Sequence, residues 1–183
     1  MKFAQALPFL GGFGFAANAL PLDETTSSLA GLTSMKMEDA SKVSGLDPVQ
    51  SRNADAIIAQ AKKDRVGEHG CTAALTTALS QTGIKILANK KVPDSVKYKH
   101  DDLGTQGDSV GIFQQSVQKY KDIACVMKAD CSAALFFRDI KAVKGWEKMD
   151  VTKLLESTNK AGTPAAFKKF EGQAAKICKD ARV

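Results

Sequence analysis

The chain has 183 residues, 44% of them apolar and 25% charged, with a formal net charge of +6. This length and composition are typical of a globular protein with a single core, and the chain is too short for us to expect two domains. The charge is uneven, since residues 20–50 carry a net charge of −3 and residues 51–183 a net charge of +8.

The first 19 residues have the layout of a secretory signal peptide. Lys2 precedes an apolar stretch over residues 6–17, and the small-residue pattern Ala17-Asn18-Ala19 follows it. A membrane anchor is the alternative, but glycines interrupt the stretch and it is shorter than the ~20 residues that a spanning helix needs. We therefore expect cleavage after Ala19, a secreted protein, and no transmembrane segment.

Residues 20–50 mix Ser, Thr, Gly, Pro and acidic residues without a sustained period, and they predict a propeptide or a flexible lead-in. Helical spacing then predicts a first helix over residues 52–66, with Ser51 or Asn53 as its cap. The alanine-rich stretch from Cys71 predicts a buried helix that ends at Gln81, just before a glycine.

Glycine, proline and polar residues over 90–115 predict loops with short extended pieces. A helix follows that is capped by Ser132 and carries Phe136 on its apolar face. Asp150 caps a short helix, and Thr163 caps the last one, which runs to the C-terminus.

Export would place the four cysteines in an oxidising compartment, where an even number favours disulfides. Cys125 and Cys131 lie six residues apart and can close locally, which leaves Cys71 to pair with Cys178. Zinc is the competing interpretation, but the spacing is not C-x2-C and the chain has only two histidines. We therefore expect two disulfides, no metal site and no cofactor.

An exported basic domain tends to meet anionic surfaces such as wall polymers, lipid headgroups or acidic glycans. A well-solvated surface without a partner is an open alternative, because lysine pairs such as Lys62-Lys63 and Lys168-Lys169 are typical of solvated helix faces.

Several short motifs together carry a family resemblance: "YKHDDLGTQ", "GDSVGIFQQ" over residues 107–115, Phe136-Phe137, Gly145-Trp146, and Pro164 with Glu171. They resemble the secreted fungal muramidases of the lysozyme superfamily, and actinobacterial lysozyme-like domains share the D-S-V-G-[IL]-F-Q-Q core. The similarity covers roughly residues 52–180. It implies a mainly α, α+β lysozyme-like fold over residues 51–183, in which a glycine-rich loop or hairpin insertion lines a cleft.

The resemblance places Gln81 where those families carry a glutamate that protonates the glycosidic oxygen. An amide has no proton to give, whereas a well-placed general acid contributes roughly 10² to 10⁴ in rate. Ser116 likewise stands where the family has arginine, and residues 159–164 differ from its Q-R-S-A-Y-P segment. These changes imply impaired hydrolysis; the alternative for Gln81 is an ordinary helix end.

Three aspartates, Asp101, Asp102 and Asp108, lie in the insertion expected to face Gln81. Glycosidases use paired carboxylates about 5 to 9.5 Å apart, so two of these residues are candidates to replace the missing acid. Aspartates in such stretches more often cap turns through their own backbone, which is the alternative for Asp108. His100 is a candidate base near neutral pH, or a surface ring beside Asp101.

The expected substrate-binding residues combine aromatic rings that stack on sugars with amides and hydroxyls that bond them. They are Tyr98, Ser109, Phe113, Gln114, Gln115 and Asn159. The two glutamines are equally suited to closing the hairpin, and Trp146, a third stacking candidate, is more typical of a core.

The sequence thus predicts a secreted, monomeric, lysozyme-like protein that binds a cell-wall glycan, either peptidoglycan or a chitin-like polymer, and not nucleic acid. With hydrolysis impaired or lost, it would act as a lectin-like protein or a fungal effector. Two alternatives stay open. One is an active muramidase that hydrolyses peptidoglycan with its aspartates, and the other is a basic antimicrobial or membrane-active protein.

Overall fold

The computed structural model describes residues 45–158 and 162–183. The expected signal peptide, most of the expected lead-in and Asn159 lie outside these residues. The longer helices are α2 (Pro48–Asp64), α3 (Gly67–Thr82), α6 (Ala129–Lys141), α7 (Val151–Thr158) and α8 (Pro164–Asp180). The shorter elements are α4 (Pro93–Val96), α5 (Ile123–Val126), the 3-10 helix η1 (Trp146–Lys148) and the strands β1 (Leu87–Asn89), β2 (Asp102–Gly104), β3 (Ser109–Val110) and β4 (Gln115–Ser116). The expected mainly α class is confirmed.

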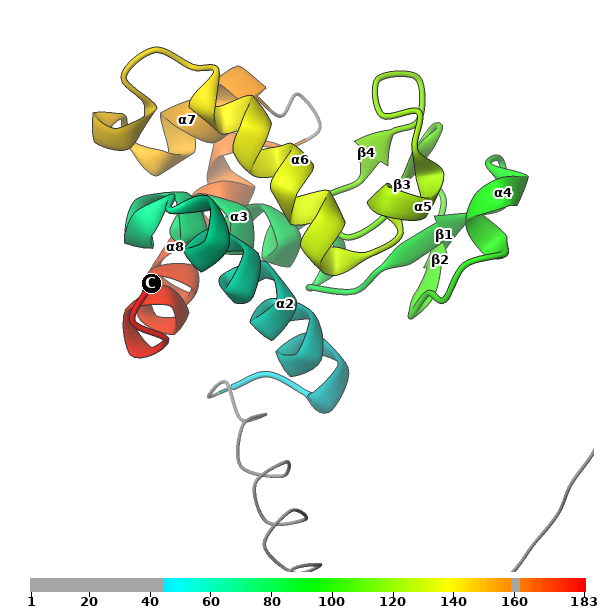
Figure 1. The fold of residues 1–183 in the computed structure, drawn as a ribbon, viewed down its shortest axis with the longest axis horizontal. Helices are drawn as coiled ribbons and strands as arrows, with labels where there is room; N and C mark the ends of the chain where they lie inside the picture. The colour runs from blue at the N-terminus through cyan, green and yellow to red at the C-terminus, as the bar shows by residue number, and fades with distance from the viewer. Residues whose placement is uncertain (1–44, 159–161) are drawn as a thin grey trace, which may run out of the picture. The chain divides into compact units, whose positions relative to one another are not determined.

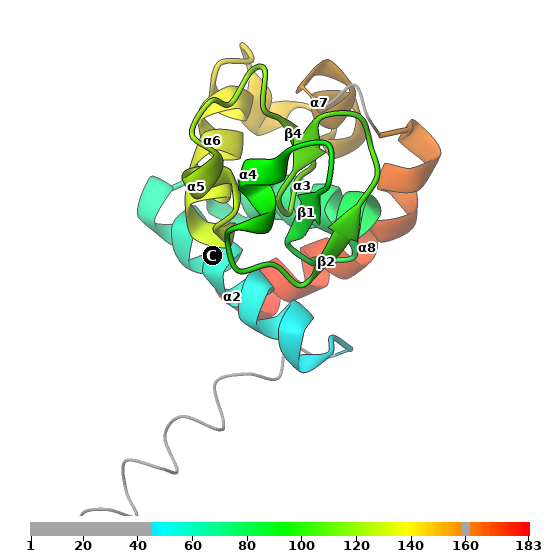
Figure 2. The ribbon, with the colours of Figure 1, turned by 90° about the vertical axis from the view of Figure 1, so that its right-hand side faces the viewer.

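The strands form two small sheets that lie together on one side of α6. β1 pairs in parallel with β2, with Leu87 opposite Asp102, and β3 pairs antiparallel with β4, with Ser109 opposite Ser116. Figure 1 shows these strands with α4 and α5 to one side of α6, and α3, α7 and α8 to the other. Figure 2 views the same arrangement from the strand side, with α3 and α8 behind the strands.

Helix α2 begins at Pro48, four residues before the expected start. Asp47 is its N-cap and accepts a hydrogen bond from the backbone of Gln50, whose side chain bonds back to the Asp47 backbone. This reciprocal capping box satisfies two backbone donors, so the prediction that Ser51 or Asn53 caps the helix was wrong. Residues 48–50, expected in the lead-in, belong to the helix.

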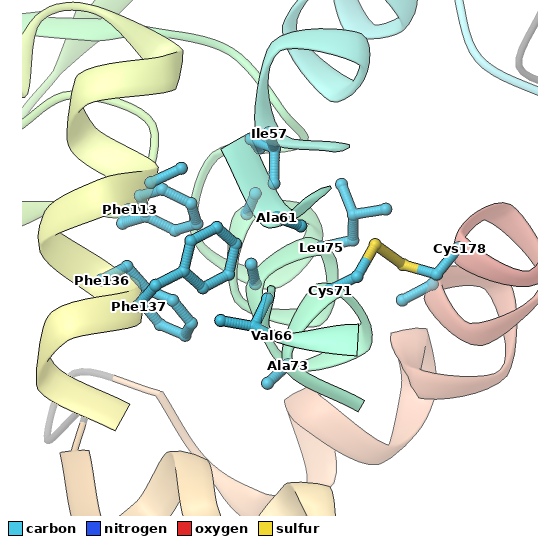
Figure 3. Close-up of a cluster of buried hydrophobic side chains, with 14 of the residues drawn as sticks. Ile57, Ala61, Val66, Cys71, Ala73, Leu75, Phe113, Phe136, Phe137 and Cys178 are labelled. Atoms are coloured by element: carbon cyan, nitrogen blue, oxygen red, sulfur yellow. A yellow bond between two sulfur atoms is a disulfide. The ribbon is translucent and has the colours of Figure 1, made fainter. Parts of the chain in front are cut away.

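Helix α3 is the centre of the main core, as its alanine-rich sequence predicts. It begins at Gly67 rather than near Cys71, and Ala73, Ala74, Leu75 and Ala78 are fully buried. Figure 3 shows Leu75 beside the Cys71–Cys178 disulfide, with Phe136 and Phe137 of α6 on the other side of the cluster. Small side chains along α3 let neighbouring helices approach closely, so α3 can be covered on several sides.

Both disulfides have the expected pairing. Cys71 in α3 is bonded to Cys178 in α8, and Cys125 in α5 is bonded to Cys131 in α6. The first bond joins two helices that lie side by side in the core (Figure 3). The second ties the strand-bearing segment to the start of α6.

The cap of α6 differs from the prediction. The helix begins at Ala129, so Ser132 lies inside it, where its buried hydroxyl donates a 2.6 Å hydrogen bond to the side-chain oxygen of Gln115. The caps of the last two helices are confirmed. Asp150 accepts from the backbone of Lys153, and Thr163 accepts from the backbone of Ala166.

Trp146 is buried in the main core, which favours the core interpretation over stacking on a sugar. Across residues 45–158 and 162–183, no helix is both long enough and apolar enough to cross a membrane.

Candidate functional site

The end of α3 is held in an unusual backbone conformation. Gly83 has φ +62° and the next residue, Ile84, has φ +60°. Ile84 is fully buried, and a β-branched residue at positive φ is strained. Such a turn persists only where its surroundings determine it. The end of α3 is therefore fixed by neighbouring elements.

Two amide side chains of α2 supply that support. Gln50 donates to the carbonyl of Gly83, and the buried Asn53 donates to the carbonyl of Ile84, both at 2.9 Å. Asn53 gives its other amide hydrogen to Asp101 at 2.8 Å. Both carbonyls of the strained turn are thus satisfied by a neighbouring helix.

Asp101, predicted as a possible catalytic acid, is the hub of this network. One carboxylate oxygen accepts from Arg52 at 2.8 Å, and the other accepts from Asn53 and from the backbone of Ile86 at 2.9 Å. The carboxylate therefore joins α2 to the start of the strand segment. Three donors on two oxygens favour a structural role.

Gln81 lies one residue before a direct link between α3 and the hairpin. The hydroxyl of Thr82 donates a 2.9 Å hydrogen bond to the carbonyl of Ile112, which precedes the expected sugar-stacking residue Phe113. Gln81 itself is half-buried. The end of α3 therefore contacts the hairpin directly through Thr82.

A cavity of about 360 Å³ lies between the hairpin and helix α6. Phe113 and Phe136 form an apolar wall, with their rings stacked at 4.9 Å between centroids. Most of the other side chains that line the cavity are polar. The full lining is Ser109, Phe113, Gln114, Gln115, Ser116, Lys119, Tyr120, Phe136, Asp139, Ile140 and Thr158.

The turn of the hairpin depends on a glycine. Gly111 has φ +77°, and a side chain there would place its Cβ 2.3 Å from the carbonyl oxygen of Val126. Only glycine fits both the conformation and the close approach. This requirement accounts physically for the glycine within the "DSVG" sequence.

The two glutamines that were expected to bind sugar differ in their hydrogen bonds and in their backbone conformation. Gln115 accepts from the Ser132 hydroxyl and donates to the Ser132 carbonyl, so it closes the hairpin onto α6. Gln114 has φ +49° and donates one hydrogen to the carbonyl of Gly111. Non-glycine residues at positive φ concentrate at functional sites, because strain persists where structure imposes it. Gln114 is therefore the stronger candidate for ligand contact.

A charged cluster that the sequence analysis missed forms one wall of the cavity. Asp139 accepts from Lys119 at 2.5 Å, from the hydroxyl of Tyr120, and from Arg138 at 2.9 and 3.1 Å. Burial raises the pKa of Asp139, but the hydrogen bonds from these three residues outweigh burial and lower it overall. The carboxylate stays ionised and orients Lys119 and Tyr120.

The same contacts shift the partners of Asp139. Its hydrogen bond raises the pKa of Lys119, and burial followed by the bond to Asp139 raises the pKa of Tyr120. Both groups therefore keep their protons at neutral pH. No spacing or motif marks Asp139 in the sequence, because it follows Arg138 in an ordinary amphipathic helix.

The other predicted residues lie elsewhere. Asp108 accepts a 2.9 Å bond from the Ser116 hydroxyl at the cavity edge. Asp102 is exposed, and its pKa is lowered by the backbone N–H of Leu103 and by Lys85. His100 forms a hydrogen bond with the carbonyl of Tyr98, whose side chain is exposed. Five of the predicted residues do not line the cavity: Gln81, Tyr98, His100, Asp101 and Asp102.

No protein-family model matches the chain, and no curated protein matches it either. Within the described residues, no group of three or more His, Cys, Asp or Glu side chains is placed to hold a metal ion.

Proposed function

We propose that the domain is a secreted, lysozyme-like protein that binds a cell-wall glycan in the cavity and has lost most or all hydrolytic activity. One observation carries the proposal. Ser109, Phe113, Gln114 and Gln115, which the sequence analysis expected to bind substrate, line a single cavity. An apolar wall beside hydroxyl and amide groups suits a pyranose, which has apolar faces and a rim of hydroxyls.

The relation between α3 and the hairpin supports the lysozyme-like assignment. The Thr82 to Ile112 hydrogen bond links the helix end that bears Gln81 to the hairpin that lines the cavity. The family resemblance implies that the acid-bearing helix end lies near the insertion and faces it across the glycan. Because the acid is replaced by an amide, the arrangement supports binding more than cleavage.

Asp139, the carboxyl group that lines the cavity, is poorly suited to replace the missing proton donor. A general acid needs a raised pKa so that it is protonated near neutral pH. The pKa of Asp139 is lowered, and its oxygens accept bonds from three side chains. Asp101 is occupied by Arg52, Asn53 and Ile86.

The two disulfides support export as part of the proposal. Disulfides form and persist mainly in oxidising compartments. A secreted protein that binds peptidoglycan or a chitin-like polymer without cutting it would act as a lectin-like protein or an effector, and the resemblance favours a fungal source.

A retention assay on insoluble peptidoglycan and chitin, combined with measurement of released reducing ends, tests the proposal. We expect retention on one of the two polymers and no release. Gln114→Asn shortens the amide that lines the cavity, and asparagine tolerates the positive φ. We expect it to weaken retention about tenfold, since a lost sugar hydrogen bond costs about 1.4 kcal/mol.

Gln118→Asn is the matched control, because Gln118 is exposed and does not line the cavity. Equal retention of the two variants would place binding elsewhere, and retention on neither polymer would reject the glycan proposal. Release of reducing ends by the natural protein would instead establish an active muramidase.

A further inference from the structure

The stretch from the end of α4 into β2 exposes apolar side chains that are not buried in the core. Within the described residues, the exposed large hydrophobic side chains are Val96 at 43%, Tyr98 at 37% and Leu103 at 44%. All three fall within eight consecutive residues. Figure 2 shows α4 and β2 on the outer side of the strand segment, facing the viewer.

Lysines flank these apolar side chains in the sequence, since Lys97 and Lys99 alternate with Val96 and Tyr98, and Lys90 and Lys91 precede α4. Lys97 pairs with Asp94 at 2.6 Å and Lys85 with Asp102 at 3.6 Å, while Asp101 pairs with Arg52. Lys90, Lys91 and Lys99 are exposed and form no ion pair within the described residues. The surface therefore carries an excess of positive charge together with its apolar groups.

The backbone beneath this surface is held firmly. Asn89 and Ser95 bond to each other through a backbone N–H and a hydroxyl, and the Asn89 side chain donates to the carbonyls of Gly107 and Ser109 at 3.1 Å. Ala88 and Val92 belong to a buried apolar cluster of this segment. The surface is thus pre-formed, so binding a partner requires little ordering of the chain.

We propose that the α4–β2 surface, defined by Lys90, Lys91, Val96, Tyr98, Lys99 and Leu103, docks onto an anionic lipid membrane. Lysine ammonium groups are attracted to anionic headgroups. Tyrosine and aliphatic side chains gain free energy at the boundary between headgroups and acyl chains.

A soluble anionic polymer satisfies only the lysines, because it offers no hydrocarbon in which to bury Val96 and Leu103. The combination of apolar and cationic groups therefore favours an anionic membrane over a soluble anionic polymer as the partner. None of the defining residues lines the cavity, so the inference goes beyond the glycan proposal and does not rest on it.

Co-sedimentation of the purified protein with vesicles tests the inference. We expect binding to phosphatidylcholine vesicles in which about one lipid in three is the anionic phosphatidylglycerol. We expect little binding to vesicles of phosphatidylcholine alone. Each lysine near an anionic surface contributes about fivefold to partition. The partition coefficient of the combined Lys90→Gln, Lys91→Gln and Lys99→Gln variant on anionic vesicles should therefore fall by about 100-fold.

The matched control makes the same change of charge elsewhere. Lys144→Gln, Lys148→Gln and Lys153→Gln replace exposed lysines at and around η1 and α7. We expect this variant to keep most of its binding to anionic vesicles. An equal loss of binding in both triple variants would mean that only the net charge of the protein matters, and it would overturn the proposal.

Insertion of the apolar groups is tested separately. Tyr98→Trp adds an exposed indole to a chain whose single tryptophan, Trp146, is buried. Its emission should shift to shorter wavelength on anionic vesicles, and Leu103→Ser should weaken binding about tenfold. Unshifted emission, or binding to neutral vesicles as strong as to anionic ones, would overturn the membrane assignment. Binding to a soluble anionic polymer as strong as to anionic vesicles would indicate that the polymer is the partner instead.

Discussion

The hydroxyl of Thr82 donates a 2.9 Å hydrogen bond to the carbonyl of Ile112 and so joins the end of the central helix to the hairpin that lines the cavity. The strained turn that follows, Gly83 to Ile84, is held by Gln50 and Asn53 of α2. The position of Gln81 is therefore fixed from both sides. A substitution at residue 81 should act through its chemistry rather than through rearrangement of the helix end.

Gln81→Glu should introduce hydrolysis of peptidoglycan if the bound glycan extends beyond the cavity to the end of α3, because Gln81 does not itself line the cavity. The new carboxyl is nearly isosteric with the amide, and partial burial at this position raises its pKa toward the value that a general acid needs. We expect lysis about 10² times above the background measured with the natural protein, at the lower end of general-acid contributions, because Ser116 also differs from the family pattern. The optimum should lie on the acid side of neutrality, measured by loss of turbidity.

Gln118→Glu adds the same charge at an exposed position and should produce no lysis. If the natural protein lyses walls as fast as the Gln81→Glu variant, residue 81 does not occupy the place of the acid. In that case the catalytic role passes to the aspartates.

Asn53→Ala should destabilise the domain far more than its neighbour Arg52→Ala. Loss of the Asn53 amide leaves the buried carbonyl of Ile84 without its donor and removes one of the three bonds to Asp101. We expect a cost of about 2 to 3 kcal/mol in the free energy of unfolding. Arg52 is 51% exposed, so its ion pair should contribute no more than about 1 kcal/mol. Urea titration of both variants measures the difference, and equal losses would contradict the role given to the turn.

The parts of the fold that the sequence predicted are those set by local patterns. The alanine-rich period placed α3, and the Asp150 and Thr163 caps were identified because an N-cap acts within three residues. The start of α2 was missed because Asp47 and Gln50 form a capping box inside a stretch whose composition suggested a lead-in. Composition averages over a window, whereas a cap depends on two side chains.

The site was harder to predict, because its contacts join distant segments. The "DSVG" motif identified the hairpin, and with it Ser109 and Gln114. Asp139 lies 19 and 20 residues from Tyr120 and Lys119, and only the packing of α6 against the hairpin brings them together. Asp101 was predicted as one of three possible catalytic aspartates, but its bonds to Arg52 and to Asn53, 48 residues earlier, give it a structural role.

Removal of the long-range disulfide should cost more stability than removal of the local one. The Cys71–Cys178 bond closes a separation of 107 residues, and the Cys125–Cys131 bond closes a separation of 6. On the chain-entropy model these loops correspond to about 4.7 and about 2 kcal/mol. Denaturant titration of Cys71→Ala with Cys178→Ala, against Cys125→Ala with Cys131→Ala, tests the order. A larger loss in the second variant would show that the local bond supports native packing as well as restricting the unfolded chain.

The cluster around Asp139 should make stability depend on pH in the acid range. Burial raises the pKa of Asp139, but the bonds from Lys119, Tyr120 and Arg138 lower it below the ordinary value of 3.8. A depressed pKa in the folded state stabilises the fold above the unfolded pKa, and this stabilisation is lost as pH falls through the folded pKa. The natural protein should therefore be more stable than Asp139→Asn at pH 6.

As the pH falls below 3.8 and through the lower pKa of the folded state, the carboxylate becomes protonated and the difference in stability between the two proteins should narrow. To measure the change, the free energy of unfolding of both proteins is determined at pH 6 and at the lowest pH at which both still fold. Asp102, whose pKa is also lowered, is present in both proteins, so its contribution cancels in the comparison. Glu156→Gln removes an exposed acid of α7 and should leave the slope of stability against pH close to that of the natural protein. A constant difference between the natural protein and Asp139→Asn across this range would mean that the aspartate acts through packing rather than through its charge.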